Sequence, residues 1–547
     1  MMTEQNVASR PRFALGVYLF LAIILVSYVA VVTDARSEKL GADAWEHHRA
    51  VLTLSQTLWR PGNPTYATDE PSIRYSPYSV ALALIVRTTG IDAYHALSGA
   101  AVFNTLLMIV AIWCWLYGYR LAPAAPMVLL AIVFLYGQSP GYANSFALSD
   151  LPWHQVNPSA FAMPLVIFAW VWHRRADGRR WFLAVVGIAI LISIAALSHG
   201  MTGLLGSFGL FVTGIAEAEQ RRARLVAALV CSVAAFGLAT LWPWYEFFSA
   251  VRGSPDQSYW FNAGILRRML LVWCLPAIAA SLAALSMREH TFIRTSLLAT
   301  VGLLVLGVAA LAVRSPTLAR LPLAGLIFPQ AVVGVFLHRV GVARLGTWPD
   351  RLRRLLDRDR ATMSPALVEI VVAAMLIGLA IPNLWLILRE PHLGRRWVAP
   401  LMGREDKQPR YWQSYEMLLA SHILPGDVVL ADPRTGWPVP SFGGRVVAAL
   451  HWEYFTGDQR RRRDDVTQFF ILDTPTVARL EVLDRYGVDW LLVDRDSLSP
   501  ALLGTLLVTD AIVADDGQRV LMAADRWRAQ HRASDLTDVP QGQGGTR

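Results

Sequence analysis

The sequence predicts a polytopic α-helical membrane protein followed by a smaller C-terminal α/β domain. Hydrophobic residues form 54% of the 547 residues, and charged residues form only 17%. Apolar runs long enough to cross a bilayer recur along the chain as far as residue 388 and then stop. A typical soluble domain is about 25% charged. The composition therefore excludes a disordered chain, a collagen and an ordinary soluble enzyme.

The formal net charge of +9 does not indicate a nucleic-acid partner. In a membrane protein, a basic excess more often reflects the cytoplasmic loops. The three cysteines, Cys114, Cys231 and Cys274, lie inside apolar runs and lack the spacing of a zinc site. We therefore expect neither a disulfide scaffold nor a thiolate metal centre.

We expect about eleven transmembrane helices, at 13–33, 94–117, 124–137, 159–173, 181–198, 201–217, 224–243, 269–286, 296–313, 321–338 and 366–388. Arg10 and Arg12 precede the first span and hold the N-terminus in the cytoplasm. Alternation then places the most basic short loops in the cytoplasm as well. The protein is expected in the inner (cytoplasmic) membrane, with residues 34–93 and everything after 389 on the periplasmic or extracellular side.

The pattern divides the chain into a transmembrane domain (1–388, with its first outer loop at 34–93), an extracytoplasmic α/β domain (389–532) and a disordered tail (533–547). Within the α/β domain, short apolar runs predict strands at 428–433, 446–450 and 489–494, and Asp516-Gly517 predicts a hairpin. Helices are expected at 411–421, 460–472 and 475–486.

The first outer loop contains the main candidate for chemistry. A helix is expected over 43–59, and it would place Asp43, Glu46 and His47 on one face. The apolar segment 78–89 is too short to span and is expected to lie along the interface, near Tyr75. The two carboxylates can serve as a general base, ligate a hard divalent cation, or form a solvated helix face.

Further candidates fall on the same predicted side of the membrane. Asp150 and His154 suit a sugar-binding mouth or an interfacial loop. His199 lies between two spans, where it is either a structural turn or a contact to phosphate or sugar. Arginines outside the cytoplasm can bind a polyprenyl phosphate or lipid headgroups, and this group comprises Arg74, Arg252, Arg267, Arg314 and Arg320.

The order of these features resembles the GT-C superfamily of polytopic glycosyltransferases, most of all its protein O-mannosyltransferase and lipid A aminoarabinose transferase branches. The resemblance rests on the early acidic pair in Asp43-Ala44-Trp45-Glu46, the turn Arg74-Tyr75-Ser76-Pro77-Tyr78, the interfacial helix and the Gly90-Ile91-Asp92-Ala93 entry to the second span. Those branches carry an adjacent Asp-Glu pair and a Pro-Pro-Leu turn, from which this sequence departs at both places.

The resemblance implies transfer of a sugar from a polyprenyl-phosphate donor to a glycan, lipid or protein acceptor, with membrane lipid as a further partner and no nucleic acid. Asp43 would be the general base and Glu46 its support, with a divalent cation, Mg or Mn, as a candidate cofactor. The substrate-binding residues would be His47, Arg74, Tyr75, Asp150, His154, His199, Arg252 and Arg267. The alternative is a non-enzymatic transporter or cell-envelope assembly protein, although the ionisable midplane groups typical of ion-coupled transport are sparse.

Overall fold

A computed structural model of the chain describes residues 5–33, 43–121, 124–135, 146–148, 151–176, 181–217, 219–252, 264, 266, 291–335, 381, 385 and 411–537. These residues form two compact units. The helical bundle comprises residues 5–33, 76–78 and the described residues from 95 to 385. The α/β unit comprises residues 43–75, 79–94 and 411–537, so it joins most of the first loop to the C-terminal part of the chain.

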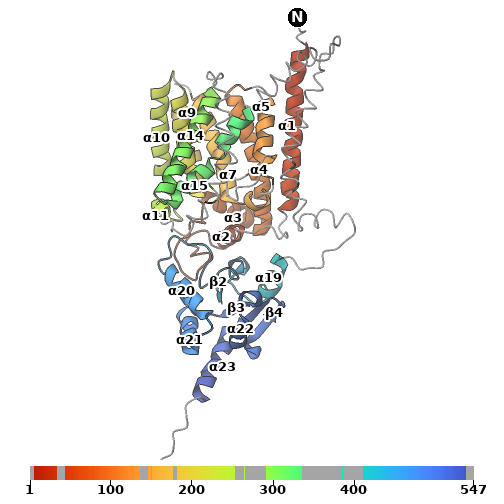
Figure 1. Ribbon diagram of the computed structural model, residues 1–547, viewed down its shortest axis with the longest axis vertical. Helices are drawn as coiled ribbons and strands as arrows, with labels where there is room; N and C mark the ends of the chain where they lie inside the picture. Colours follow the sequence, from red (N-terminus) through yellow and green to blue (C-terminus); the bar gives the residue numbers. More distant parts are fainter. Residues whose placement is uncertain are drawn as a thin grey trace, which may run out of the picture. The chain divides into compact units, whose positions relative to one another are not determined.

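The bundle is built from helices that run alongside one another (Figure 1). They are α1 (Gln5–Val32), α4 (Ala93–Gly118), α5 (Ala124–Leu135), α6 (Leu151–His154), α7 (Pro158–Arg175), α8 (Trp181–Ser198), α9 (Gly200–Ala216), α10 (Arg221–Ala239), α11 (Phe247–Arg252), α14 (Thr291–Ala312) and α15 (Pro316–Ala324).

Four described helices, α4, α8, α10 and α14, are long and apolar enough to cross a membrane, while the apolar stretches Leu15–Ala30 and Gly200–Ala216 are shorter. Long apolar helices of this kind are what a bilayer requires. Of the expected spans, 269–286 lies outside the described residues, as does 366–388 apart from two positions. The segment expected to span at 321–338 is interrupted by a turn at Gly325, just after Pro322.

An aromatic cluster forms the centre of the bundle. Trp115 of α4 is 1% exposed and packs edge-on against Phe292 and Phe328, at ring-centroid distances of 5.0 and 6.0 Å. Trp170 of α7 stacks on Phe328 at 4.8 Å, and its indole N–H donates to the Gly206 carbonyl. A side chain at Gly209 would collide with Trp170, so a glycine there lets α7 and α9 approach closely.

The α/β unit contains α2 (Ala44–Gln56) and most of α3 (Pro77–Thr89) from the first loop. Its C-terminal elements are α19 (Tyr411–Leu419), β1 (Val428–Ala431), β2 (Arg445–Val446), α20 (Gln459–Phe469), α21 (Thr476–Arg485), β3 (Trp490–Asp494), α22 (Pro500–Leu506), β4 (Ile512–Asp515), β5 (Arg519–Ala523) and α23 (Ala524–Thr537). The helices, the hairpin and the strands expected near 428 and 490 are therefore present with slightly different bounds, whereas the strand expected at 446–450 is limited to Arg445–Val446.

The five strands form one sheet in the order β2-β1-β3-β5-β4. β1 pairs in parallel with both β2 and β3, whereas β5 pairs antiparallel with β3 and β4. Gly517 lies in the β4–β5 turn with φ of +88°, a conformation that favours glycine. The parallel half of the sheet therefore places the residues that follow β1, β2 and β3 at one edge.

Alternating side chains divide the core between the two faces of the sheet. Leu491 and Val493 pack with residues of α20 to α23, including the fully buried Trp527. Leu492 faces the other way and packs with α19 and with Tyr66, a residue of the first loop. The same loop binds the edge of the sheet, because the Val446 N–H donates to the Thr65 carbonyl over 2.9 Å.

The described part of the first loop packs with the C-terminal residues, and its Tyr66 fills the core of the sheet. α23 continues to Thr537, and its Trp527 is held in the core with the indole N–H donating to the Leu506 carbonyl. The expected domain bounds stay a prediction. Residues 538–547 lie outside the described residues.

Candidate functional site

The start of α2 brings two carboxylates together. Asp43 immediately precedes the helix, and its carbonyl accepts hydrogen bonds from the backbone N–H groups of Glu46 and His47, each over 3.1 Å. Glu46 therefore lies in the first helical turn, where a negative charge is favourable. The Asp43 side chain is 42% exposed, whereas that of Glu46 is 9% exposed.

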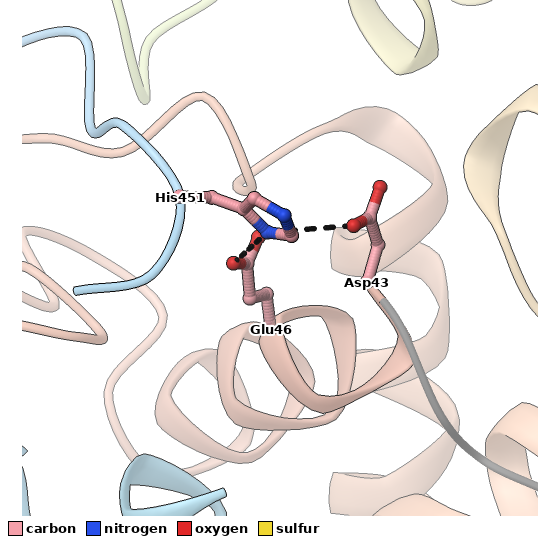
Figure 2. Close-up of side chains that lie close together, drawn as sticks. All are labelled: Asp43, Glu46 and His451. Carbon is pink, nitrogen blue, oxygen red and sulfur yellow. Dashed lines mark hydrogen bonds and ion pairs between the residues drawn. The ribbon is translucent and has the colours of Figure 1, made fainter. Parts of the chain in front are cut away.

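His451 completes this pair from the C-terminal part of the chain. It follows β2, and its Nδ1 lies 2.6 Å from Oε1 of Glu46 and 3.4 Å from Oδ1 of Asp43. Figure 2 shows the imidazole between the two carboxylates, with Glu46 on α2, Asp43 immediately before it and the histidine on the C-terminal segment. We call these three residues the Asp–Glu–His cluster.

Two further side chains hold the Glu46 carboxylate in place. Arg74 forms a salt bridge with Oε2 of Glu46, and the arginine side chain is only 17% exposed. The Trp437 indole N–H donates to Oε1 of Glu46 over 3.3 Å, and its ring meets the His451 imidazole edge-on at 5.2 Å. Both oxygens of Glu46 are thus engaged by protein groups, while Asp43 remains the accessible carboxylate.

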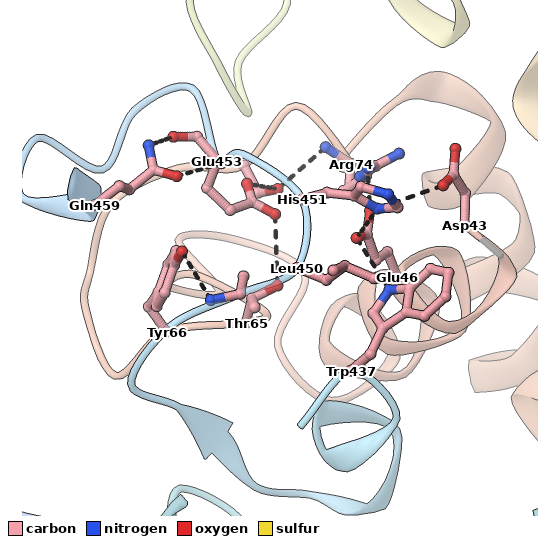
Figure 3. Close-up of polar contacts among 12 residues, drawn as sticks. Asp43, Glu46, Thr65, Tyr66, Arg74, Trp437, Leu450, His451, Glu453 and Gln459 are labelled. Atoms are coloured by element: carbon pink, nitrogen blue, oxygen red, sulfur yellow. Dashed lines mark hydrogen bonds and ion pairs between the residues drawn. The ribbon is translucent and has the colours of Figure 1, made fainter. Parts of the chain in front are cut away.

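A second buried carboxyl group lies beside the cluster (Figure 3). Glu453 is 4% exposed and accepts from the Ser72 and Thr65 hydroxyls over 3.0 and 3.4 Å. Its backbone N–H donates to the Gln459 side chain over 2.6 Å. These bonds fix the segment that carries His451 against the first loop.

Burial and neighbouring charges shift the pKa values of the titratable groups of the site in different directions. Burial opposes ionisation of Glu46, but Arg74 and His451 outweigh it and hold the pKa of Glu46 well below its usual range. Burial lowers the pKa of His451, but Glu46 and Asp43 outweigh it and raise that pKa above 6.5. Burial raises the pKa of Glu453 to about 7 despite the opposing effect of Arg74. Glu46 is therefore ionised at neutral pH, while Glu453 keeps its proton to a higher pH than an exposed glutamate does.

The Asp–Glu–His cluster can also hold a metal ion. One ligand atom from each residue lies within 4.8 Å of the others. Two carboxylate oxygens with one imidazole nitrogen suit Mn²⁺ or Zn²⁺ better than Mg²⁺, which prefers oxygen ligands alone. Imidazole ligates through a lone pair, so binding through Nδ1 replaces the hydrogen bond to Glu46. The three side chains can therefore bind a cation, and protonation of His451 competes with that binding.

Two other candidates from the first loop have different surroundings. His47 is buried in α2, and the described group that can hold a metal contains His451 in its place. Tyr75 is 1% exposed, and its hydroxyl donates to the Gly62 carbonyl over 2.7 Å. Tyr75 therefore closes the loop on itself, and its expected contact with substrate stays a prediction.

The bundle carries the remaining candidates. His199 lies between α8 and α9, and its Nδ1 is 2.7 Å from the Thr202 hydroxyl, as in a structural helix start. His154 ends the short helix α6 and is half-buried. Asp150 and Arg267 lie outside the described residues, and Arg252 is described only as the last residue of α11.

The sequence analysis missed His451, Trp437 and Glu453. A usable signal was present, because ligands of α/β folds gather beyond the carboxyl ends of parallel strands. His451-Trp452-Glu453 directly follows the apolar run 446–450, which was identified as a strand. Asp432 and Asp494, which also follow strands, instead accept backbone N–H groups of their own turns.

No family model and no curated protein matches the chain. Its structure is similar to that of an *Archaeoglobus fulgidus* oligosaccharyltransferase in the apo form, with 11% identity and a TM-score of 0.49 over 87% of this chain and 69% of that chain. The archaeal oligosaccharyltransferase AglB of that organism, with an inhibitory peptide and a dolichol-phosphate, is 12% identical, with a TM-score of 0.43 over 87% of this chain and 69% of that chain. The Archaeoglobus fulgidus enzyme with Zn and sulfate is 13% identical, with a TM-score of 0.45 over 87% of this chain and 68% of that chain. The contacts of the cluster itself carry the chemistry proposed below.

Proposed function

We propose that the protein is a membrane glycosyltransferase of GT-C type, which transfers a sugar from a polyprenyl-phosphate donor to an acceptor on the outer face of the membrane. The observation that carries the proposal is the accessible Asp43 carboxylate beside a Glu46 that Arg74 and His451 keep ionised. A non-enzymatic scaffold does not require this buried charge, which is costly to assemble.

In this proposal Asp43 is the general base of an inverting displacement. One of its oxygens takes the proton of the acceptor hydroxyl while the acceptor oxygen bonds to the anomeric carbon. The bond from that carbon to the phosphate oxygen breaks, and polyprenyl phosphate leaves as an anion. Glu46 is unsuited to this role, because Arg74, His451 and Trp437 occupy its two oxygens.

Positive charge close to Asp43 suits the phosphate of the donor. Arg74 pairs with Glu46 and supplies a fixed cation, which also stabilises charge that develops on the leaving group. A divalent ion held by Asp43, Glu46 and His451 would supply Lewis-acid stabilisation of that phosphate. We propose that Arg74 binds the donor phosphate. Of the two candidate cations, Mn²⁺ suits the ligands of the cluster better than Mg²⁺ does.

The contacts of the first loop support the proposed topology. Residues 43–75 share a core and backbone hydrogen bonds with residues 411–537, which supports placing both segments on one side of the membrane. On that placement the intervening chain crosses an even number of times, as it would with the proposed eleven spans. We propose that this side is the periplasmic or extracellular one and that the N-terminus is cytoplasmic. Asp150, His154, His199, Arg252 and Arg267 remain proposed contacts to donor or acceptor on that side.

The test is turnover of the purified full-length chain with a panel of polyprenyl-phosphate sugars, followed as release of polyprenyl phosphate. Asp43→Asn should lower the rate by about 10²–10⁴-fold. Asp69→Asn is the matched control, because Asp69 is an exposed aspartate of the same loop. Full activity of Asp43→Asn would assign the base elsewhere. Absence of donor consumption by the wild type would favour the transporter or assembly-protein alternative.

A further inference from the structure

A large cavity opens among the helix ends of the bundle, far in sequence from the Asp–Glu–His cluster. Its volume is about 1080 Å³. It is lined by residues at the ends of α4, α7 and α9 and at the starts of α10 and α14. The charge pattern of the sequence predicts that these helix ends face the cytoplasm. We call this space the basic cavity.

Charge dominates its lining. Five arginines and two glutamates line the basic cavity, a formal charge of +3, and they are Arg120, Arg174, Arg175, Arg224, Arg294, Glu217 and Glu219. So many cations around one space repel one another unless an anion lies between them. A protein that keeps them together therefore gains from an anionic ligand.

Two of the arginines build the wall of the cavity. Nε of Arg174 lies 3.0 Å and Nε of Arg224 lies 3.2 Å from the Glu217 carboxylate. The Arg174 guanidinium also lies over the Tyr119 ring at 4.0 Å, and Arg224 donates to the Arg174 carbonyl over 2.8 Å. Glu217 thus neutralises one of the two positive charges, and the three side chains brace α7, α9 and α10 against one another.

The other three arginines are exposed on the cavity and, together with Glu219, contribute two of its three excess positive charges. Arg120, Arg175 and Arg294 come from three different helix ends, and Glu219 is the remaining acidic residue of the described lining. Arg120 has a φ of +54°, a left-handed conformation that glycine adopts at lower cost. The chain therefore keeps an arginine side chain at the cavity in spite of an unfavourable backbone conformation.

Aromatic residues share the lining with these cations. Trp113 and Tyr117 lie on α4 within its last two turns, and the Arg175 guanidinium lies over the Tyr117 ring at 5.7 Å. Tyr117 is 65% exposed. Tryptophan and tyrosine are enriched at the level of the lipid headgroups, so the cavity borders both the headgroup layer and the apolar phase.

We propose that the basic cavity binds the phosphate headgroup of an anionic phospholipid. Basic pockets between transmembrane helices on the cytoplasmic side bind such headgroups, and arginine forks match the oxygens of a phosphate. Trp113 and Tyr117 favour a lipid over a free phosphate ion, because they offer surface to its glycerol and acyl region. This site is independent of the proposed transferase chemistry.

The test is native mass spectrometry of the full-length chain released from nanodiscs that contain equal amounts of phosphatidylglycerol and phosphatidylcholine. The wild type should retain phosphatidylglycerol in preference to phosphatidylcholine. The double variant Arg120→Gln/Arg294→Gln should lose that preference, with roughly a fivefold loss of affinity for each arginine. Arg222→Gln is the matched control, since Arg222 is an exposed arginine at the start of α10 that does not line the cavity.

A thermal-unfolding titration in neutral detergent separates the possible sources of phosphate. Phosphatidylglycerol should raise the Tm of the wild type and of Arg222→Gln, but not that of the double variant, while inorganic phosphate should leave all three unchanged. An equal rise with inorganic phosphate would overturn the lipid assignment in favour of a soluble phosphate. Equal retention of phosphatidylglycerol by wild type and double variant would overturn the site itself.

Discussion

Glu46 and His451 lie 405 residues apart in the chain, and a hydrogen bond of 2.6 Å joins their side chains. The first residue belongs to α2 in the first loop, and the second follows β2 of the sheet. The candidate site is therefore composite, and the C-terminal residues contribute directly to it. Variants in either segment should consequently alter the same chemistry.

The buried pair Glu46–Arg74 predicts a stability effect. Arg74→Met leaves the Glu46 carboxylate with less compensation, so the free energy of unfolding should fall by about 3 kcal/mol. Thermal unfolding of the purified chain measures this change. Arg87→Met, an exposed arginine of α3, is the control and should have little effect. Adding Glu46→Gln to Arg74→Met should recover part of the loss, and a purely additive double variant would contradict the pairing.

Glu453 predicts a pH dependence. Its pKa is about 7 in the folded protein, above the ordinary value of 4.5, because burial favours the neutral form. Its contribution to stability is therefore greatest below pH 4.5 and is lost as pH rises through 7. The Tm of Glu453→Gln should rise relative to wild type between pH 5 and pH 8. A constant difference across that range would mean that Glu453 does not titrate there.

Glu46 predicts a dependence of stability on pH that is opposite in sign to that of Glu453. Its pKa is held below the ordinary value by Arg74 and His451, so its contribution is present above pH 4.5 and is lost as pH falls further. The Tm of the wild type should drop steeply on acidification below pH 4.5, and Glu46→Gln should flatten this drop. The Tm difference between the two proteins over pH 3 to 6 provides the measurement, and parallel curves would argue against the assignment.

Cation binding is testable without substrate. Since one ligand of the cluster is an imidazole, Mn²⁺ should raise the Tm of the chain more than Mg²⁺ does. His451→Gln should reduce the Mn²⁺ effect, and Asp43→Asn should reduce it as well. His422→Gln, at a histidine outside the cluster, should respond like the wild type. An unchanged Mn²⁺ shift in both cluster variants would place the ion at another site.

A buried arginine of the α/β unit predicts a further stability effect. Arg479 is 2% exposed, and it donates to the carbonyls of Phe469 and Ile471 over 3.0 and 2.7 Å, where α20 ends. Arg479→Met leaves those carbonyls without their donor and should cost about 2–3 kcal/mol. The exposed Arg485→Met is the comparison and should cost well under half as much. Circular dichroism of the full chain during heating would report both.

Local patterns predicted much of this fold. The strands near 428–431 and 490–494, the hairpin at Gly517 and the helices α2, α3, α20 and α21 follow from apolar periodicity and turn residues. Those signals depend only on neighbours in the sequence. The packing of Tyr66 into the core of the sheet depends on a contact across the whole chain, and no local pattern encodes it.

The same distinction applies to the site. Asp43, Glu46 and Arg74 share one loop, so their proximity was open to prediction from a helix start and a turn. His451 approaches them through long-range contacts, among them the hydrogen bond from Val446 to the Thr65 carbonyl and the bonds from Ser72 and Thr65 to Glu453. The described group that can hold a metal contains His451, whereas the substrate contact expected of His47, which is buried in α2, stays a prediction.

The hydrogen bond between Thr65 and Val446 joins a residue made early in translation to one made late, which has a consequence for folding during biosynthesis. The ribosome makes the first loop early, but the partners of Glu46 and Tyr66 emerge only near the end of translation. The first loop therefore lacks its partners in the core until the C-terminal residues have been made. A nascent or prematurely terminated chain would carry Asp43 and Glu46 but not His451, so the Asp–Glu–His cluster would be absent from it.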